Sequence, residues 1–313
     1  MLRIVVASPS FSRHPVLRQE LLAIFPQTQF FDGEKVLAGQ ALLDHLAAAE
    51  IALIGTEKID GTLLAALPKL KFIAKYGVGL DNIDLEACRK NGVGIGWTPG
   101  VNARCVAELT LGFMLGLTHN VFHTTTLLRQ GTWHKRGGVQ LTGKTVGIIG
   151  IGHVGREVIR LLAPFGCILL GNDIEDRNAF CREWNVKLTD KGAIYASADI
   201  ISLHVPLTPE THHLINTAVL ARCKPGAFLI NTARGSVVEQ AALQAALESG
   251  ALGGAALDVF DPEPPTDLEF LGQQKLVASP HIGGNADEAV LAMGRSAIAH
   301  ITRRKKQYFP IQI

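Results

Sequence analysis

The 313-residue sequence predicts an α/β protein with two doubly wound parallel sheets, each in its own domain, and a cleft between the domains. Short apolar runs alternate with helical patterns along the chain, which is typical of parallel sheets. The length suits two domains of ordinary size. The alternation breaks at Thr98-Pro99-Gly100. We therefore expect one domain from residues 1–99 and 286–313, and a second from residues 100–285.

The first domain is expected to contain five strands separated by helices. The strand candidates are Leu2–Ala7, Gln29–Phe31, Ile51–Ile54, Lys71–Tyr76 and Val93–Trp97, and the helical patterns are His14–Ile24, Gln40–Ala49, Asp60–Ala66 and Leu85–Lys90. The fourth strand runs into Gly77-Val78-Gly79, where backbone N–H groups can bind a carboxylate. A plain turn into a capped helix is the alternative.

The second domain contains a glycine-rich turn between a strand and a helix. Gly150, Gly152 and Gly155 form G-x-G-x-x-G with His153 and Val154, directly after the apolar run Thr145–Ile149. Such glycines allow a tight turn, a close approach of the backbone to a pyrophosphate, and close packing of helix on strand. The free N–H groups at the helix start then face the phosphates. A glycine-rich turn without a ligand is the alternative.

An acidic residue follows the next apolar run. Asp173 lies 18 residues beyond Gly155, after Cys167–Gly171, where a carboxylate accepts hydrogen bonds from the adenosine ribose. The carboxylate would repel a 2′-phosphate, and the nearest arginine is Arg177. The pattern thus predicts a Rossmann domain that binds NAD in preference to NADP.

Polar residues also follow the remaining strand candidates of this domain. These candidates are Asp199–His204, Ala227–Asn231, Gly254–Asp258 and Leu276–Ala278. In open α/β sheets, ligands bind at the carboxyl ends of the strands. Hydride transfer to a 2-keto acid requires a cation for its carboxylate, a proton donor, and a carboxylate behind that donor. Arg234, His281 and Glu263 can fill these roles, and neighbouring strands can bring Glu263 and His281 together.

Several segments resemble the signature blocks of the D-isomer-specific 2-hydroxyacid dehydrogenases, nearest to the phosphoglycerate dehydrogenase-like branch. They are Gly77–Asp84, His204–Thr208, Thr232–Gly235, Ala256–Phe260 with Glu263-Pro264, and Ser279–Gly284. The resemblance implies a flavodoxin-like substrate domain and an NAD-dependent oxidoreductase acting on a small D-2-hydroxy or 2-keto acid of the hydroxypyruvate, glyoxylate or phosphoglycerate type.

The resemblance also implies roles for particular residues. Arg234 would hold the substrate, His281 would be the acid/base, and Glu263 would be its partner. The implied cofactor residues, besides the glycine-rich turn, Asp173, Arg234 and His281, are Val106, Val205, Thr232, Ala233, Asp258 (at the nicotinamide carboxamide) and Gly283. The backbone of Val78 and Gly79 would bind the substrate carboxylate.

One departure from the family pattern concerns the substrate. The 3-phosphoglycerate enzymes carry an arginine near the end of the strand at Ile51–Gly55, whereas here only Lys58 offers a cation. This counts against 3-phosphoglycerate itself. The intact Glu263 disfavours formate, whose dehydrogenases of this fold carry Gln there. An NADH-responsive co-regulator using the same fold is the alternative from another class, and a reductase of another carbonyl is a third.

The composition favours a protein without nucleic-acid or membrane partners. The net charge is +2, and the five cysteines show no metal-like grouping. No run reaches the length of a membrane span, and Ile4–Ala7 is too short for a signal peptide, so we expect a cytoplasmic protein. Residues 102–140 contain a long apolar helix, Asn102–Arg129, and a loop with Trp133, His134 and Arg136. The resemblance implies that this arm joins a homodimer.

Overall fold

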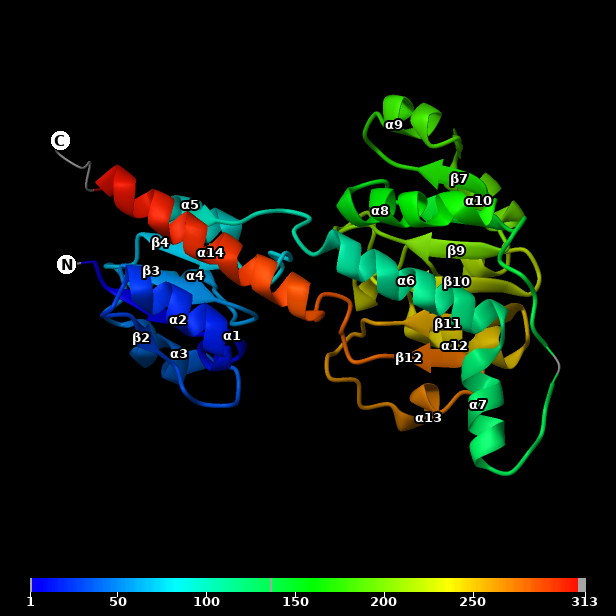
Figure 1. Ribbon diagram of the computed structural model, residues 1–313, viewed down its shortest axis with the longest axis horizontal. Helices are drawn as coiled ribbons and strands as arrows, with labels where there is room; N and C mark the ends of the chain where they lie inside the picture. Colours follow the sequence, from blue (N-terminus) through cyan, green and yellow to red (C-terminus); the bar gives the residue numbers. More distant parts are fainter. Residues whose placement is uncertain (1, 136, 309–313) are drawn as a thin grey trace. The chain divides into compact units, whose positions relative to one another are not determined.

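The computed structural model describes residues 2–135 and 137–308, except the side chains of residues 305–308. The chain divides into two compact units (Figure 1), one formed by Met1–Asn102 with Asp287–Ile313 and the other by Ala103–Ala286. Each unit is built on a parallel sheet, with five strands in the first and seven in the second. The predicted α/β class with two parallel sheets is confirmed.

The first unit has the strand order β2-β1-β3-β4-β5, which is the order of flavodoxin-like sheets. Its strands are β1 (Ile4–Val6), β2 (Gln29–Phe30), β3 (Ile51–Ile54), β4 (Phe72–Lys75) and β5 (Gly94–Gly96). Its helices are α1 (Pro9–Arg13), α2 (Pro15–Ile24), α3 (Gly39–Leu46), α4 (Gly61–Ala65), α5 (Leu85–Lys90) and α14 (Asp287–Tyr308). The side chains of Asp60 and Asp84 cap α4 and α5.

The C-terminal helix α14 completes the core of the first unit. Figure 1 shows it in red alongside the blue and cyan elements, and its buried residues Ala297, Ile298 and Ile301 lie in one cluster with residues of β1, α2 and β3. The packing is close, because a Cβ at Gly294 would lie 2.3 Å from Leu17 Cδ1. A segment almost 300 residues from the start of the chain therefore covers one face of the first sheet.

The second unit has the order β12-β11-β10-β9-β6-β7-β8, which contains the Rossmann order with one further strand at the β12 edge. Its strands are β6 (Thr145–Ile149), β7 (Ile168–Asn172), β8 (Val186–Leu188), β9 (Ile200–Leu203), β10 (Ala227–Asn231), β11 (Leu252–Leu257) and β12 (Leu276–Ala278). Its helices are α6 (Ala103–Thr118), α7 (Val121–Arg129), α8 (His153–Leu162), α9 (Asn178–Glu183), α10 (Lys191–Ser197), α11 (Thr217–Leu220), α12 (Gln240–Glu248) and α13 (Leu268–Leu271), with short 3-10 turns at Ala163–Phe165 and Gly235–Val237.

The single long helix predicted over residues 102–129 is wrong. The structure contains two helices, α6 and α7, because Asn120 takes a left-handed conformation with φ of 56° that an α-helix cannot continue. Phe122 of α7 folds back on α6, where a Cβ at Gly116 would lie 2.0 Å from its ring. In the described part of the chain, no single helix is long and apolar enough to cross a membrane, although α6 and α7, bent by 64°, pass that test together.

Candidate active site

The three glycines of the turn after β6 are needed for three different reasons. Gly150 has φ of +94°, and a Cβ there would lie 2.4 Å from the carbonyl oxygen of His204. A Cβ at Gly155 would lie 2.0 Å from the carbonyl oxygen of Gly150, whereas nothing lies within 4 Å of one at Gly152. The side of the turn at Gly152 is therefore open to a ligand, and the other two glycines hold the turn against β6 and β9.

The start of helix α8 provides donors at this open side. Gly152 is its N-cap and offers no side chain, so no side-chain hydrogen bond caps the helix. The first N–H groups of a helix have no partner within it and attract anions, as does the helix dipole. Gly152, His153, Val154 and Gly155 thus form the kind of cradle that a dinucleotide pyrophosphate fits. Val205, after β9, borders the turn, since its Cγ1 would lie 3.1 Å from a Cβ at Gly150.

Asp173 follows β7, the strand that pairs with β6. Its Oδ2 accepts a hydrogen bond from the N–H of Ile151 in the glycine-rich turn at 2.6 Å, and its Oδ1 accepts one from the N–H of Glu175 at 2.8 Å. The carboxylate therefore lies directly beside the turn. Each of its oxygens retains acceptor capacity for a further donor, such as a ribose hydroxyl.

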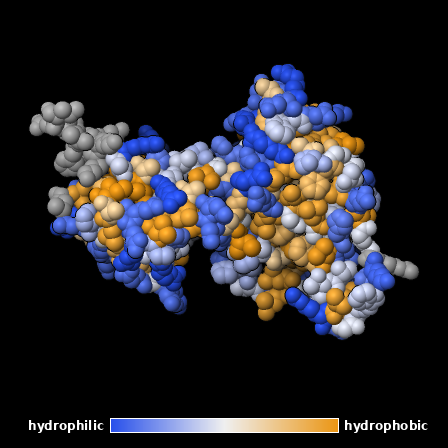
Figure 2. Space-filling model, viewed as in Figure 1, coloured by the Kyte–Doolittle hydropathy of each residue, from blue (hydrophilic) through white to orange (hydrophobic). Residues whose placement is uncertain are grey.

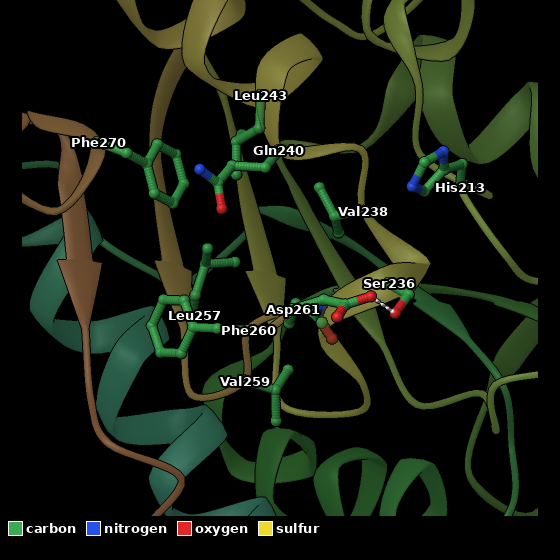
Figure 3. Close-up of a pocket in the computed structure, with 12 residues that line it drawn as sticks. His213, Ser236, Val238, Gln240, Leu243, Leu257, Val259, Phe260, Asp261 and Phe270 are labelled. Atoms are coloured by element: carbon green, nitrogen blue, oxygen red, sulfur yellow. Dashed lines mark hydrogen bonds between the residues drawn. The ribbon is translucent and has the colours of Figure 1, made fainter. Parts of the chain in front are cut away.

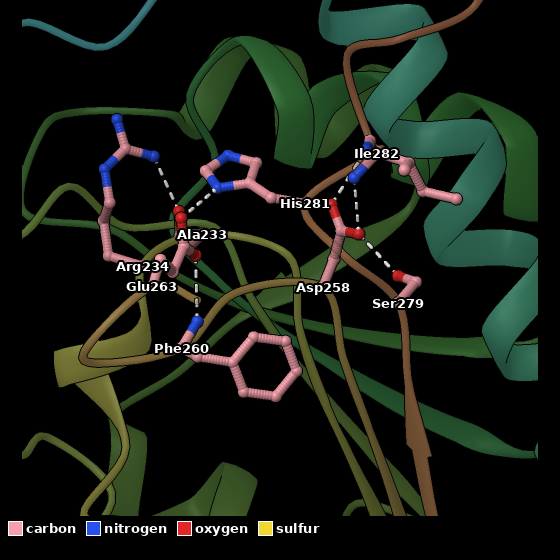
Figure 4. Close-up of polar contacts among 9 residues, drawn as sticks. Ala233, Arg234, Asp258, Phe260, Glu263, Ser279, His281 and Ile282 are labelled. Carbon is pink, nitrogen blue, oxygen red and sulfur yellow. Dashed lines mark hydrogen bonds and ion pairs between the residues drawn. The ribbon is translucent and has the colours of Figure 1, made fainter. Parts of the chain in front are cut away.

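Glu263 and His281 lie in direct contact (Figure 4). Glu263 Oε2 is 2.8 Å from His281 Nδ1, and Glu263 Oε1 accepts the N–H of Phe260 at 3.0 Å. Because an ionised carboxylate only accepts hydrogen bonds, Nδ1 carries a proton and Nε2 is the ring atom left for exchange with a substrate. Both side chains are partly exposed, His281 by 51% and Glu263 by 37%. The pair is therefore oriented on one side and accessible to a ligand.

The loop that carries His281 is wrapped around the carboxylate of Asp258. This side chain is buried, and it accepts hydrogen bonds from the N–H of Ile282 at 2.8 Å, the N–H of Gly283 at 2.7 Å and the hydroxyl of Ser279. His281, inside this loop, has φ of 53°, in the left-handed region. Such a conformation is uncommon for a residue with a side chain. The contacts of Asp258 thus hold the backbone that aims His281 at Glu263 (Figure 4).

The family resemblance implies only a nicotinamide contact for Asp258 and no role for Ser279. In the structure, three of the acceptor positions of Asp258 are taken by the loop after β12 that carries His281. A buried acidic residue at a strand end, with a serine and two glycines after the neighbouring strand, was the available signal. Gly283 lies between this carboxylate and helix α6, since a Cβ added at Gly283 would be 2.9 Å from Asp258 Oδ2 and 3.6 Å from Val106 Cγ1.

The segment with Arg234 follows β10, the neighbour of β11. Asn231 accepts the N–H of Ala233 at 3.0 Å and donates to the carbonyl oxygen of Arg234 at 2.8 Å, which closes the turn after the strand. Arg234 Nη1 donates to the carbonyl oxygen of Ala233 at 2.6 Å (Figure 4). The hydroxyl of Thr232 is 3.0 Å from that of Thr110 on α6. Arg234, Glu263 and His281 therefore follow three adjacent strands, β10, β11 and β12.

Val78, Gly79 and Lys58 belong to the first unit. The loop with Val78 and Gly79 is braced at its base, where Lys75 Nζ donates to Asn82 Oδ1 at 2.8 Å, and at its tip, where the indole N–H of Trp97 donates to the carbonyl oxygen of Val78 at 2.6 Å. Val78 and Gly79 are half-buried and Lys58 is exposed.

Polar side chains connect this loop to the loop after β3. Asn82 also donates to the carbonyl oxygens of Glu57 at 2.6 Å and Gly55 at 3.1 Å, and the buried Lys75 donates to Gly55 as well. Burial raises the pKa of the Glu57 carboxyl, which is 1% exposed. The loops after β3 and β4 are thus tied together by side chains.

The second unit also contains a separate small pocket (Figure 3). It has a volume of about 100 Å³ and is lined by His213, Asn231, Gly235, Ser236, Val238, Gln240, Leu243, Leu257, Val259, Phe260, Asp261 and Phe270. Ser236, which lines it, donates a hydrogen bond to Asp261. Neither Arg234 nor Glu263 nor His281 lines it. Among the described residues, no group of His, Cys, Asp and Glu could hold a metal ion.

Comparison with known proteins shows the family. Residues 111–283, more than half of the chain, match the model of the D-isomer specific 2-hydroxyacid dehydrogenase, NAD binding domain. The chain is 37% identical to a hydroxypyruvate reductase of Thermotoga maritima, over 78% of this chain and 80% of that protein. It is 34% identical to a D-3-phosphoglycerate dehydrogenase of Methanocaldococcus jannaschii over 94% of this chain, but it spans only 56% of that protein.

Solved structures agree with these matches. A D-lactate dehydrogenase of Aquifex aeolicus, solved with NAD and lactic acid, is similar with a TM-score of 0.86 and 27% identity, over 97% of this chain and 95% of that one. A glyoxylate reductase of Paecilomyes thermophila is similar with a TM-score of 0.88 and 26% identity, over 98% and 96%. The resemblance seen in the sequence motifs is confirmed. The chain belongs to the D-isomer specific 2-hydroxyacid dehydrogenase family.

Proposed function

We propose that the chain is an NAD-dependent dehydrogenase that interconverts a small D-2-hydroxy acid and its 2-keto acid. The observation that carries this proposal is the Glu263–His281 pair, held after β11 and β12 of the same sheet whose β6 ends in the dinucleotide cradle. The second unit would bind the cofactor and the first would contribute to substrate binding. The named activities of the relatives, on hydroxypyruvate, glyoxylate, 3-phosphoglycerate and lactate, support this substrate class.

The side chains divide the chemistry as follows. A nicotinamide bound at this site would supply the hydride to the 2-carbon in the reduction and accept it in the oxidation. His281 delivers a proton from Nε2 to the oxygen of the 2-keto group as it becomes a hydroxyl, and takes it back in the oxidation. Glu263 holds the ring at Nδ1 and stabilises its protonated form. Arg234 binds the substrate carboxylate through its planar fork of donors.

The cofactor assignment favours NAD over NADP. Asp173, beside the glycine-rich turn, would accept hydrogen bonds from the two ribose hydroxyls and would repel a phosphate there. The remaining cofactor contacts are assigned to side chains and backbone around the turn and the strand ends. They are Val106, Gly150, Gly152, His153, Val154, Gly155, Val205, Thr232, Ala233, Arg234, Asp258, His281 and Gly283.

Besides Arg234, the backbone N–H groups of Val78 and Gly79 are assigned to the substrate carboxylate, and their loop is braced by Lys75, Asn82 and Trp97. Lys58 is the cation proposed to lie near the far end of the substrate. A lysine there, without an arginine on the preceding strand, suits a small acid such as glyoxylate or hydroxypyruvate better than a phosphorylated one.

We also propose a homodimer joined through residues 102–140. Leucines of α6 remain half-buried, and Figure 2 shows apolar residues gathered on the face of this unit that bears α6. Large apolar side chains are exposed on α7 and after it, including Phe122 at 39%, Leu128 at 55% and Trp133 at 74%. Apolar surface of this kind marks interfaces. Arg136, which was expected in the loop of this arm, lies outside the described residues. The cytoplasmic location of the protein stays a prediction.

The test is NADH oxidation, followed by nicotinamide absorbance, with glyoxylate, hydroxypyruvate, pyruvate and 3-phosphohydroxypyruvate. We expect turnover of one or more of them, and a loss of at least about 100-fold in His281→Ala, since general acid catalysis contributes that much. Glu263→Gln, which keeps the size of the side chain, should lower kcat and change its pH profile. Tight NADH binding without turnover of any of these acids would contradict the proposal and favour the co-regulator alternative.

A further inference from the structure

We propose that Glu175 is a second residue that determines the choice of cofactor, and that Arg177 is a phosphate-binding group held out of use by Glu175 and Asp173. The inference rests on the proposed function, in which Asp173 faces the adenosine ribose. It deepens that function, because it assigns the rejection of NADP to three side chains and predicts what their removal produces.

The position of the Asp173 carboxylate is surrounded by donors. The N–H of Ile151 lies 2.6 Å from Oδ2, the N–H of Glu175 lies 2.8 Å from Oδ1, and Arg177 Nε lies 3.4 Å from Oδ2. Two backbone donors and one guanidinium thus surround a single oxyanion, which is here the protein's own carboxylate. A phosphate is bound by the same kinds of donor. If the carboxylate were removed, the donors would remain for an external anion.

Arg177 has an unused donor at this position. Only 17% of its side chain is exposed, and its Nε is buried without a hydrogen-bond partner in the part of the chain that the structure describes. A buried donor that lacks a partner is rare enough to need an explanation. The guanidinium presents a planar fork that matches phosphate oxygens. Its distance to Oδ2 of Asp173 shows that an anion in the carboxylate's place would be within its reach.

Glu175 holds the other end of the same guanidinium. Its Oε2 is 2.5 Å from Arg177 Nη2, although 66% of the Glu175 side chain is exposed. Arg177 therefore lies between two carboxylates, so the group of three carries a net negative charge. This negative charge would repel a 2′-phosphate, which is itself doubly charged or nearly so. The ribose of NAD, with a neutral hydroxyl, would not.

The test uses ligands that contain only the adenosine half of each cofactor. Adenosine 2′,5′-bisphosphate carries the 2′-phosphate of NADP, and 5′-AMP lacks it; both are titrated calorimetrically into the full chain. The variants are Asp173→Ser/Glu175→Gln, the same pair with Arg177→Gln, and Asp173→Ser/Asp176→Asn. The last is a matched control, because it removes the same number of charges and leaves Glu175 on Arg177. Thermal unfolding checks that each variant is folded.

We expect wild-type protein to bind NADH and 5′-AMP and to discriminate against the bisphosphate. Asp173→Ser/Glu175→Gln should bind the bisphosphate about 10- to 100-fold more tightly than wild type does, the range for charge-assisted hydrogen bonds. Adding Arg177→Gln should remove that gain and leave 5′-AMP binding unchanged. The Asp176 control should gain less.

Three results would overturn the inference. If Arg177→Gln leaves the gain intact, Arg177 does not bind the phosphate. If the Asp176 control gains as much, net charge alone explains the change and Glu175 has no special part. If wild type binds neither NADH nor 5′-AMP, the proposed function itself fails, and the inference fails with it, which distinguishes that case from the first two.

Discussion

Replacing Asp258 with Asn tests whether this carboxylate positions His281. The asparagine keeps the size of the side chain and one carbonyl oxygen, which still accepts from Ser279 and Ile282. In the wild-type chain, the other oxygen accepts a hydrogen bond from the N–H of Gly283 at 2.7 Å. In the variant, an NH₂ group replaces this oxygen and faces the same N–H. Two donors then oppose each other in a site where the side chain is 1% exposed.

The magnitude follows from the bonds lost. A hydrogen bond to a charged group contributes about 1.5–3 kcal/mol, and a buried donor left without a partner costs a similar amount. Asp258→Asn should therefore lower the free energy of unfolding by about 2–4 kcal/mol. The loop relaxes and the left-handed residue His281 moves away from Glu263. A displacement of about 1 Å at a catalytic group lowers kcat by roughly 100-fold.

The assay combines urea unfolding with steady-state kinetics in both NADH and keto acid. Ser279→Ala is the matched control, since it removes one donor to the same carboxylate and leaves both backbone donors; it should cost about 1 kcal/mol and lower kcat less. The reasoning is refuted if Asp258→Asn keeps the stability and kcat of wild type. A rise in the KM for NADH alone would leave Asp258 with its proposed cofactor contact and no part in positioning His281.

Three further predictions concern other parts of the chain. Burial lowers the pKa of His204 from 6.5 to about 3, so His204 stays neutral in the folded state at a pH where the unfolded state binds a proton. The contribution of His204 to stability is therefore complete above pH 6.5 and falls by about 1.4 kcal/mol per pH unit below it. Urea unfolding should show this slope, and His204→Asn should reduce it. Gly155→Ala should destabilise the fold by about 1–3 kcal/mol, because the added Cβ would lie 2.0 Å from a carbonyl oxygen. Gly152→Ala has open space around the added Cβ, so this variant should unfold like wild type but lose NADH binding in a fluorescence titration. Lys75→Met and Asn82→Ala, which release the Val78 loop, should each raise the KM for the keto acid about tenfold with no change in NADH affinity; a change in NADH affinity instead would contradict the division of roles between the two units.

The repeating part of the fold was predictable from the sequence because its signal is local. Buried strands such as Ile51–Ile54 are apolar runs, and the turns after them contain the glycines that the backbone needs. The strand Val186–Leu188 was not predicted. It is three residues long at the edge of the sheet, and two of its residues are exposed, so it has neither the length nor the apolar pattern of a buried strand.

The break between α6 and α7 was missed for a different reason. Residues 102–129 carry no proline, and the helical pattern continues through them. The chain turns at Asn120, which reaches the left-handed region more easily than most residues, and α7 folds back so that Phe122 fills the space above Gly116. A small residue on one helix and a ring on the next make that contact only after folding. Tertiary packing, and not local propensity, decides where the first helix ends.

One part of the candidate site was predictable from the sequence and another part was not. The residue types at the strand ends were visible because hydride transfer restricts the choice to a few side chains, and the order of strands in a Rossmann sheet places them at one edge. The direction in which His281 points was not visible. It depends on a left-handed backbone held by a carboxylate 23 residues earlier in the chain, and no pattern around His281 encodes that contact. Asp258 looks like a ligand-binding residue in the sequence because acids at strand ends usually are, and the structure shows that the loop carrying His281 donates three hydrogen bonds to it.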